Sequence, residues 1–187
     1  MPAKPPPTVG RTAVNANVMI VLRPRDNTNE RYVLVIESPQ ARARKEPYLE
    51  FPKGAFDASG SFTGPMMDNI RREIGFKLSE YHLINLTALV QETRPSVCEP
   101  GPPTEPAVRS IHANPNTTLL LWERFLDRKE VENYRDRRAP NEACNIRMLD
   151  YDYLYEKAEL RYGWAMYELL HGSGILQQQL NDKRIGK

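Results

Sequence analysis

The chain has 187 residues and a formal net charge of only +2, so we expect one domain with a substantial core and no required nucleic-acid or membrane partner. Its two cysteines, Cys98 and Cys144, are too few for a disulfide framework or a zinc site. No apolar run approaches the roughly 20 residues that span a bilayer. We therefore expect reduced thiols and an intracellular location, either cytoplasmic or mitochondrial.

The first half of the sequence predicts strands. Residues 1–12 are rich in proline and lack a hydrophobic core, so we expect a flexible lead-in and no secretory signal. Two apolar runs with many branched side chains, 16–23 and 31–38, predict strands. The residues between them are typical of a turn, so these strands should be antiparallel neighbours. A short strand at 48–51 should end at Pro52-Lys53-Gly54.

A helix is predicted to begin at Pro65, because the missing N–H of proline is not needed at the first helical position. Apolar side chains recur every four residues through this helix and predict a core-facing stripe: Met66, Ile70 and Ile74, with Met67 beside them. Gly75 is typical of the residue that ends a helix. Asp68 and Arg72 have the spacing of an ion pair one helical turn apart.

The second half contains further strands around an unusual segment. The runs at 83–90 and 117–125 predict strands, and 145–149 predicts a last, shorter one. Between the first two, residues 94–116 contain six prolines. A loop of this length is uncommon in a compact domain unless it is functional or disordered. Whether it closes on a ligand or binds a partner stays open.

Helices are expected at the end of the chain. The spacing of Leu154, Ala158 and Leu160 predicts a short helix, and a longer one should run from Trp164 to Gly172. Residues 177–187 are polar, and we expect them to form a frayed tail. The order of strands, one helix, more strands and then helices predicts a mixed α+β domain.

The segment from Gly54 to Phe76 resembles the box of the Nudix hydrolases, whose pattern is G-x5-E-x7-R-E-U-x-E-E-x-G-U, with U an apolar residue. The lead-in Leu-Glu-Phe-Pro at 49–52 is similar to the members that hydrolyse ADP-ribose and other ADP-sugars. The resemblance implies a Nudix-fold α/β/α sandwich with a mixed β-sheet over residues 13–176. Such members often form homodimers, so a homodimer is an open alternative.

The box keeps its frame and loses most of its acids. Four positions agree with the pattern: Gly54, Ile70, Gly75 and Phe76. Gly60 replaces the first glutamate, and Asp68-Asn69 replaces the Arg-Glu pair. The Glu-Glu pair becomes Arg72-Glu73, so half of it remains.

The resemblance implies that the positions of Asn69, Arg72 and Glu73 once held a divalent metal, with Glu50 joining them. These three positions share one helical face, where three carboxylates would suit Mg²⁺. The face now offers an amide, a guanidinium that cannot ligate, and one carboxylate. We therefore expect at most weak binding of Mg²⁺ or Mn²⁺ by Glu50 and Glu73, which are also the candidate catalytic residues.

Three residues are candidates for binding phosphate. The Arg72 guanidinium suits a diphosphate where the metal once lay, and Lys53 and Gly54 lie beside it in the box. The alternatives are a solvated ion pair of Arg72 with Asp68 and a solvated Lys53.

Three functions remain open at this point. The favoured one is a Nudix-like pseudoenzyme that binds a nucleoside diphosphate derivative or an RNA end, or serves as an assembly module, with weak or no hydrolysis. The alternative is an active metal-dependent pyrophosphatase for ADP-ribose, ADP-sugars or related compounds, using Glu50, Glu73 and either Glu99 or Glu105. The third is a purely structural subunit of a larger ribonucleoprotein assembly.

Overall fold

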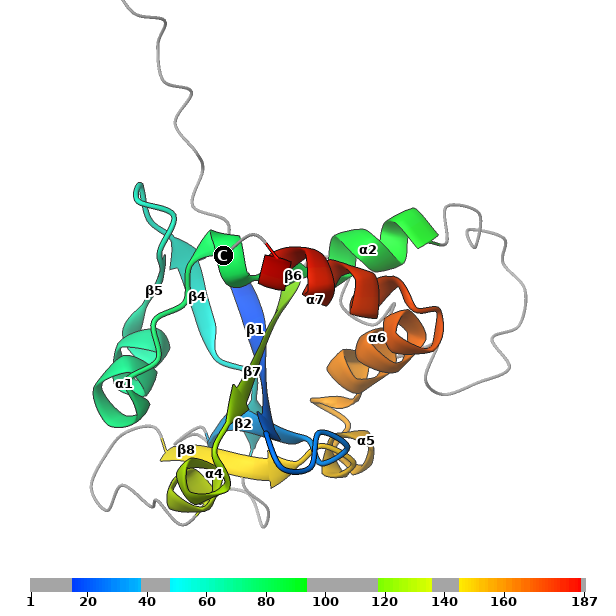
Figure 1. The fold of residues 1–187 in the computed structure, drawn as a ribbon. Helices are drawn as coiled ribbons and strands as arrows, with labels where there is room; N and C mark the ends of the chain where they lie inside the picture. Colours follow the sequence, from blue (N-terminus) through cyan, green and yellow to red (C-terminus); the bar gives the residue numbers. More distant parts are fainter. Residues whose placement is uncertain (1–14, 38–47, 94–117, 136–144, 186–187) are drawn as a thin grey trace, which may run out of the picture.

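The computed structural model describes residues 15–37, 48–93, 118–135 and 145–185, and Figure 1 shows their arrangement. The strands are β1 (Asn15–Pro24), β2 (Tyr32–Glu37), β3 (Leu49–Glu50), β4 (Lys53–Phe56), β5 (Phe62–Thr63), β6 (Ile84–Asn85), β7 (Thr118–Leu126) and β8 (Asn145–Asp150). The helices are α1 (Pro65–Ile74), the 3₁₀ turn η2 (Glu80–His82), α2 (Leu86–Thr93), α4 (Arg128–Arg135), α5 (Tyr153–Glu156), α6 (Arg161–Gly172) and α7 (Ile175–Ile185). The lead-in at 1–12, the segment 94–116, both cysteines, Glu99 and Glu105 lie outside the described residues.

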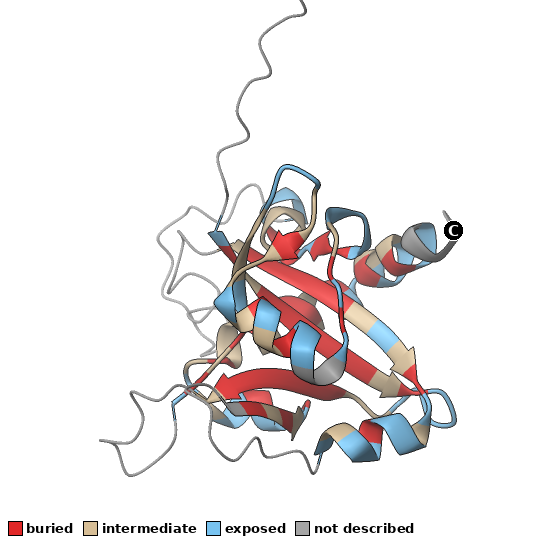
Figure 2. Ribbon diagram, turned by 90° about the vertical axis from the view of Figure 1, so that its left-hand side faces the viewer, coloured by how far each residue is buried: buried red, intermediate tan, exposed pale blue. Residues whose placement is uncertain are grey.

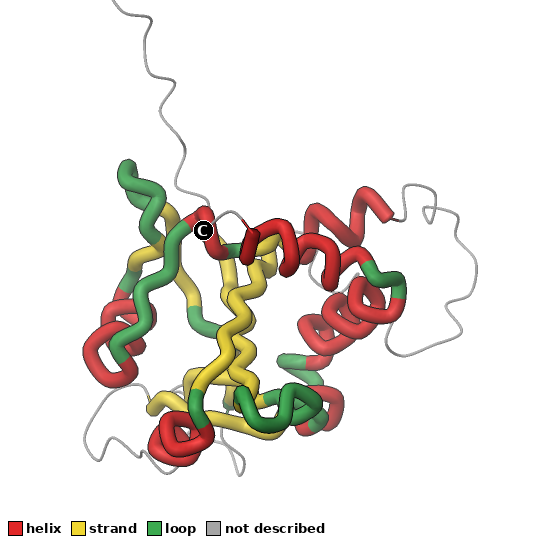
Figure 3. Tube along the Cα trace, in the orientation of Figure 1, coloured by secondary structure: helices red, strands yellow, loops and turns green. Residues whose placement is uncertain are grey.

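β1 is the centre of a mixed sheet (Figure 3). One edge of β1 pairs with β7 in parallel, from Ala16 opposite Thr118 to Pro24 opposite Leu126. The other edge is shared by two antiparallel partners. β4 pairs with Asn15–Asn17, and β2 pairs with 20–22. The predicted antiparallel neighbours β1 and β2 are therefore confirmed.

The sheet forks halfway along β1. Beyond its contact with β1, β2 pairs with β3 at its far end and with β8 along its other edge. The chain then crosses from β3 to β4, and the Pro52 carbonyl accepts a hydrogen bond of 2.8 Å from the Val18 N–H in the middle of β1. Glu50 and Lys53 thus lie on either side of the crossing point.

Alternate residues of β1 belong to two separate hydrophobic cores, one on each face of the sheet, which we call the first and the second core. Val18, Ile20 and Leu22 belong to a cluster with residues of α1 and α4. Met19 and Val21 belong to a second cluster with residues of α2, α6 and α7. Helices therefore cover both faces of the sheet, and the buried strands lie between them (Figure 2). This layered architecture confirms the predicted mixed α+β class. In the described part of the chain, no helix combines the length and the apolarity needed to cross a membrane.

The prediction of a strand at 83–90 is wrong. Only Ile84–Asn85 is extended, and a helix follows. Asn85 caps that helix, because its Oδ1 accepts the N–H of Ala88 at 3.0 Å. Leu86 and Val90, one turn apart, face the core. A short apolar run cannot by itself distinguish a strand from a buried helix.

The end of the chain also differs from expectation. Residues up to Ile185 form α7, although we expected 177–187 to fray. Leu176 and Leu180 are buried one turn apart and dock the helix on the second core. The helix α4, where Val131 is buried, was also not predicted. One or two apolar residues among many polar ones form too weak a pattern to predict a helix.

Candidate functional site

The start of the box forms a β-hairpin. β4 and β5 pair through Ala55–Thr63 and Phe56–Phe62, and the turn between them is built by Asp57. Asp57 Oδ1 accepts the N–H groups of Ser59 at 2.8 Å and Ser61 at 3.0 Å. The hydrogen bonds from Ser59 and Ser61 lower the pKa of Asp57. Gly60, which replaces the first glutamate of the box, has a φ of 78° in this turn.

Gly54 allows a close approach of two strands. A Cβ atom on Gly54 would lie 2.5 Å from the Thr63 carbonyl oxygen and 2.7 Å from the Phe62 ring. Gly64 has a φ of 141° and lies against Gly54 on the other side. The two glycines therefore bring the β5–α1 junction onto β4. This packing explains why Gly54 is required, independently of any ligand.

α1 begins and ends as predicted. Pro65 occupies its first turn, and Gly75 closes it in the left-handed conformation with φ 80°. Met67 and Ile70 are buried in the first core, and Met66 packs against it. The side chains of Ile74 and Glu73 lie outside the described part, so the predicted stripe is confirmed up to Ile70 and the role of Glu73 stays a prediction.

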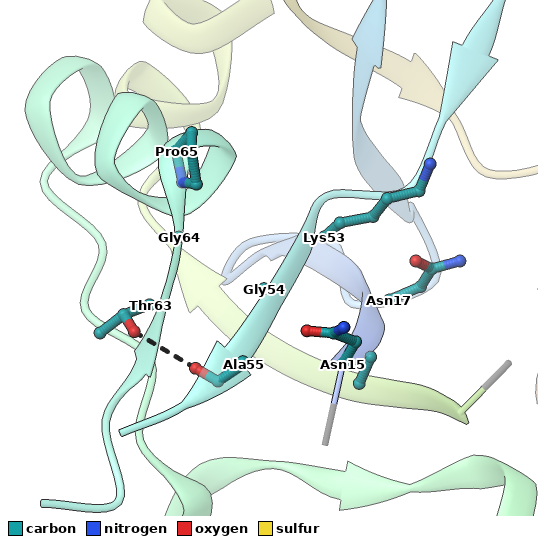
Figure 4. Close-up of a pocket in the computed structure, with 9 residues that line it drawn as sticks. Asn15, Asn17, Lys53, Gly54, Ala55, Thr63, Gly64 and Pro65 are labelled. Carbon is teal, nitrogen blue, oxygen red and sulfur yellow. Dashed lines mark hydrogen bonds between the residues drawn. The ribbon is translucent and has the colours of Figure 1, made fainter. Parts of the chain in front are cut away.

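An open pocket of about 450 Å³ lies at the start of β1, beside β4 and the β5–α1 junction (Figure 4). It is lined by Asn15, Ala16, Asn17, Lys53, Gly54, Ala55, Thr63, Gly64 and Pro65. This volume falls within the range of small-molecule sites. Among the described residues, no side chain caps the N-terminus of α1, which borders the pocket and carries the positive end of the helix dipole.

The structure brings two predicted site residues together. The Lys53 ammonium forms an ion pair with the Glu50 carboxylate. The Lys53 side chain is more than half exposed, whereas Glu50 is largely covered. The backbone N–H of Lys53 donates to Met66 Sδ at 3.4 Å, which ties β4 to the first turn of α1. Lys53 can still offer donors to a ligand, because an ammonium has three.

The outer face of α1 brings several charged and polar side chains together. Arg72 Nη2 donates to Asn69 Oδ1 at 3.0 Å, so two of the replaced box positions contact each other. Asp68 pairs with Arg71, at 3.2 Å. Both i+3 and i+4 neighbours are within reach on a helix, and the pair of Asp68 with Arg72 stays a prediction. Arg72 is not among the residues that line the pocket.

Within the described residues, no three or more histidine, cysteine, aspartate or glutamate side chains come together as a metal site. The Glu73 side chain is not part of that comparison. Glu50 faces a cation of the chain itself, Lys53, which competes with any metal for the same carboxylate.

Two residues beside the pocket, Asn17 and Tyr162, were not predicted as site residues. Asn17 Nδ2 donates to the Tyr162 hydroxyl at 2.8 Å, although the two residues are far apart in the chain. Burial raises the pKa of Tyr162 to about 12, so its hydroxyl stays protonated at neutral pH. One feature of the sequence could have indicated Asn17. Asn15 and Asn17 are two residues apart at the start of an apolar strand, so their side chains lie on the same face.

Chemically, the pocket offers an ammonium, two amides and the positive end of a helix, which together suit an anion with polar groups attached. No protein-family model and no curated protein sequence matches the chain.

Proposed function

We propose that this chain is a Nudix-like protein that binds the phosphate end of a nucleotide, a nucleoside diphosphate derivative or an RNA end, and hydrolyses it weakly or not at all. The observation that carries this proposal is the pocket of about 450 Å³ with the Lys53 ammonium in its wall. An intracellular setting and a role as a homodimer or as a subunit of a larger assembly are compatible parts of the same proposal.

Binding is supported by the charge and chemistry of the pocket wall. Lys53 supplies a positive charge, and the N-terminus of α1 adds a partial one. Backbone N–H groups at a helix N-terminus and a nearby ammonium are a common combination for phosphate. Asn15 adds an amide that can donate to a phosphate oxygen.

Weak hydrolysis is supported by the face of α1. Two unit charges about 4 Å apart interact by roughly 4 kcal/mol at an effective dielectric near 20, and a dication beside Arg72 would feel about twice that as repulsion. Arg72 donates to Asn69 on this face. A cluster of Mg²⁺ or Mn²⁺ ions is therefore disfavoured, and a single weakly held ion between Glu50 and Glu73 is the most that the proposal allows.

The first test is binding to the intact chain. Pyrophosphate, AMP and ADP-ribose should each raise the melting temperature, and a ligand at about 100 times its Kd should add about 2.7 kcal/mol of stability. Lys53→Met should remove most of this effect, whereas Lys129→Met, an exposed lysine on α4, should keep it. No stabilisation by any of the three ligands would overturn the proposal and favour the structural role.

The second test separates binding from hydrolysis. We expect little or no AMP from ADP-ribose with Mg²⁺ or Mn²⁺. Efficient turnover that disappears in Glu73→Gln would establish the active pyrophosphatase instead.

A further inference from the structure

We propose that Asn17, oriented by Tyr162, accepts a hydrogen bond from a hydroxyl or amino group next to the ligand's phosphate, so that the pocket prefers a sugar phosphate over phosphate alone. This inference rests on the proposed phosphate-binding function and goes beyond it by naming the group that is recognised beside the phosphate. Three observations on Asn17 and its neighbours carry it.

Asn17 is directly opposite Lys53 in the pairing of β1 with β4. Residues opposite each other in an antiparallel pair have their side chains on the same face, with Cβ atoms about 4.5–5.5 Å apart. A ligand whose phosphate contacts Lys53 therefore places the next group along its chain beside Asn17.

The orientation of the Asn17 amide is fixed by its partner. Its Nδ2 donates one N–H to the Tyr162 hydroxyl at 2.8 Å, which places the nitrogen on the Tyr162 side of the amide. Oδ1 is on the opposite branch of the amide and can only accept. In Figure 4 the oxygen of Asn17 faces the Gly54 side of the pocket and the nitrogen faces away.

Tyr162 is itself held in place. Its ring packs edge-to-face on Phe51, with centroids 5.5 Å apart and an interplanar angle of 82°. The next residue, Gly163, is pressed against the same ring, since a Cβ there would lie 2.6 Å from Phe51. The hydroxyl that orients Asn17 therefore belongs to a packed junction of α6 with the sheet. An acceptor that is already in position costs the ligand little ordering.

The Glu50 carboxylate lies beside Lys53 through their ion pair, although Glu50 is not among the residues that line the pocket. A bare phosphate carries acceptors toward the Asn17 oxygen, whereas a sugar carries donors. The Asn17 acceptor therefore favours a phosphate that has hydroxyl or amino groups attached.

The experiment compares affinities by calorimetry for four probes: inorganic phosphate, ribose 5-phosphate, AMP and 2′,3′-dideoxy-AMP. We expect wild type to bind ribose 5-phosphate or AMP more tightly than phosphate. Asn17→Leu, which has a similar volume and no amide, should reduce this preference by roughly 3- to 10-fold, the worth of one neutral hydrogen bond. Asn133→Leu, an exposed asparagine on α4, is the matched control and should keep the preference.

Tyr162→Phe tests the positioning step and keeps the ring that packs on Phe51. It should lower the same preference by a smaller factor, with the melting curve showing a folded protein. An unchanged preference in both Asn17→Leu and Tyr162→Phe would overturn the inference while phosphate binding stands. If wild type binds none of the four probes, the proposed function fails, and the inference fails with it.

The probes also identify the donor. Ribose 5-phosphate has hydroxyls without a base, and dideoxy-AMP has the base amine without the diol. If Asn17→Leu loses the tighter binding of ribose 5-phosphate over phosphate, the donor is a hydroxyl. If it loses the tighter binding of dideoxy-AMP over phosphate, the donor is the amine. Either result supports the inference.

Discussion

Gly54 illustrates how a single missing side chain can fix a site. The Thr63 carbonyl and the Phe62 ring occupy the space that any Cβ at this position would need. The residue therefore acts through packing, by letting β4 and β5 approach at the rim of the pocket. Gly54 also lines the pocket wall, and its role in phosphate binding stays a prediction.

We expect Gly54→Ala to lower the free energy of unfolding by about 1–3 kcal/mol, because the backbone of β5 must move to admit the methyl group. Gly172→Ala is the matched control, since no described atom lies within 4 Å of a Cβ there and α6 gains a better helix former. Urea denaturation of the two variants measures the difference. Equal stabilities would contradict the close packing.

The buried tyrosines make a second prediction at the residue scale. Burial raises the pKa of Tyr162 and of Tyr167 from 10.0 to about 12. The folded state therefore holds these protons more tightly, and the stability they contribute is present below pH 10 and is lost as the pH rises toward 12. Between pH 10 and pH 12, the raised pKa of each tyrosine should lower the free energy of unfolding by on the order of 2 kcal/mol.

The measurement is the urea midpoint at about pH 8 and about pH 11.5 for wild type and Tyr167→Phe. The drop between the two pH values should be smaller in the variant, because one raised pKa has been removed. Tyr167 also donates to Glu123 at 3.0 Å and accepts from Arg23 at 2.6 Å, so the variant should be less stable at both pH values. An equal drop in both proteins would contradict the raised pKa.

At the scale of elements, an ion-pair network joins the β1–β2 turn to α4. Arg128 donates to Asp26 at 2.7 Å and to Glu30 at 2.8 Å. Tyr32 donates to the same Glu30 oxygen at 2.9 Å. The hydrogen bond from Arg128 to Glu30 is the largest cause of a lowered Glu30 pKa, and the bond from Tyr32 adds to it. Together they lower this pKa from 4.5 to about 2.

Arg128→Met should raise the pKa of Glu30 back toward 4.5, which a carbon-detected NMR titration of the side chain would follow. The lowered pKa contributes stability above pH 4.5 that is lost as the pH falls toward 2, and the variant should lose this dependence. Lys129→Met, the exposed neighbour, should leave the Glu30 titration unchanged. A Glu30 pKa that stays near 2 without Arg128 would refute the network.

The docking of α7 gives a further prediction for an element. Leu180→Ala should cost about 2–5 kcal/mol, because Leu180 is buried against the second core. Gln178→Ala, exposed on the same helix, should change the stability by no more than about 0.5 kcal/mol. A frayed tail, as first expected from the sequence, would show no difference between the two variants.

Elements with long or well-punctuated patterns could be predicted from the sequence. β1, β2 and β7 have continuous apolar runs, and α1 has proline and glycine at its ends. The apolar run of α2 is short enough to be taken for a strand, and α7 has few apolar residues at the core, chiefly Leu176 and Leu180 in its described part. Local pattern does not contain the tertiary contacts that decided these cases.

At the scale of the molecule, the same limit applies to the candidate site. Glu50 and Lys53 are three residues apart, so their proximity could be foreseen. The Asn17–Tyr162 contact depends on α6 packing over β1, which no local motif encodes. The box residues Gly54, Gly64 and Pro65 line the pocket, while the contact proposed to set its preference joins Asn17, before the box, to Tyr162, far behind it.

The parallel pairing of β1 with β7 has a consequence for how the chain is made. Ala16 finds its partner Thr118 only after about a hundred further residues have been added. At ribosomal speeds of about 5–20 residues per second, one edge of the first strand stays open for roughly 5–20 s. An apolar edge exposed for that long attracts other nascent chains. We therefore expect refolding to be slow, because this parallel pair must close a loop of about a hundred residues.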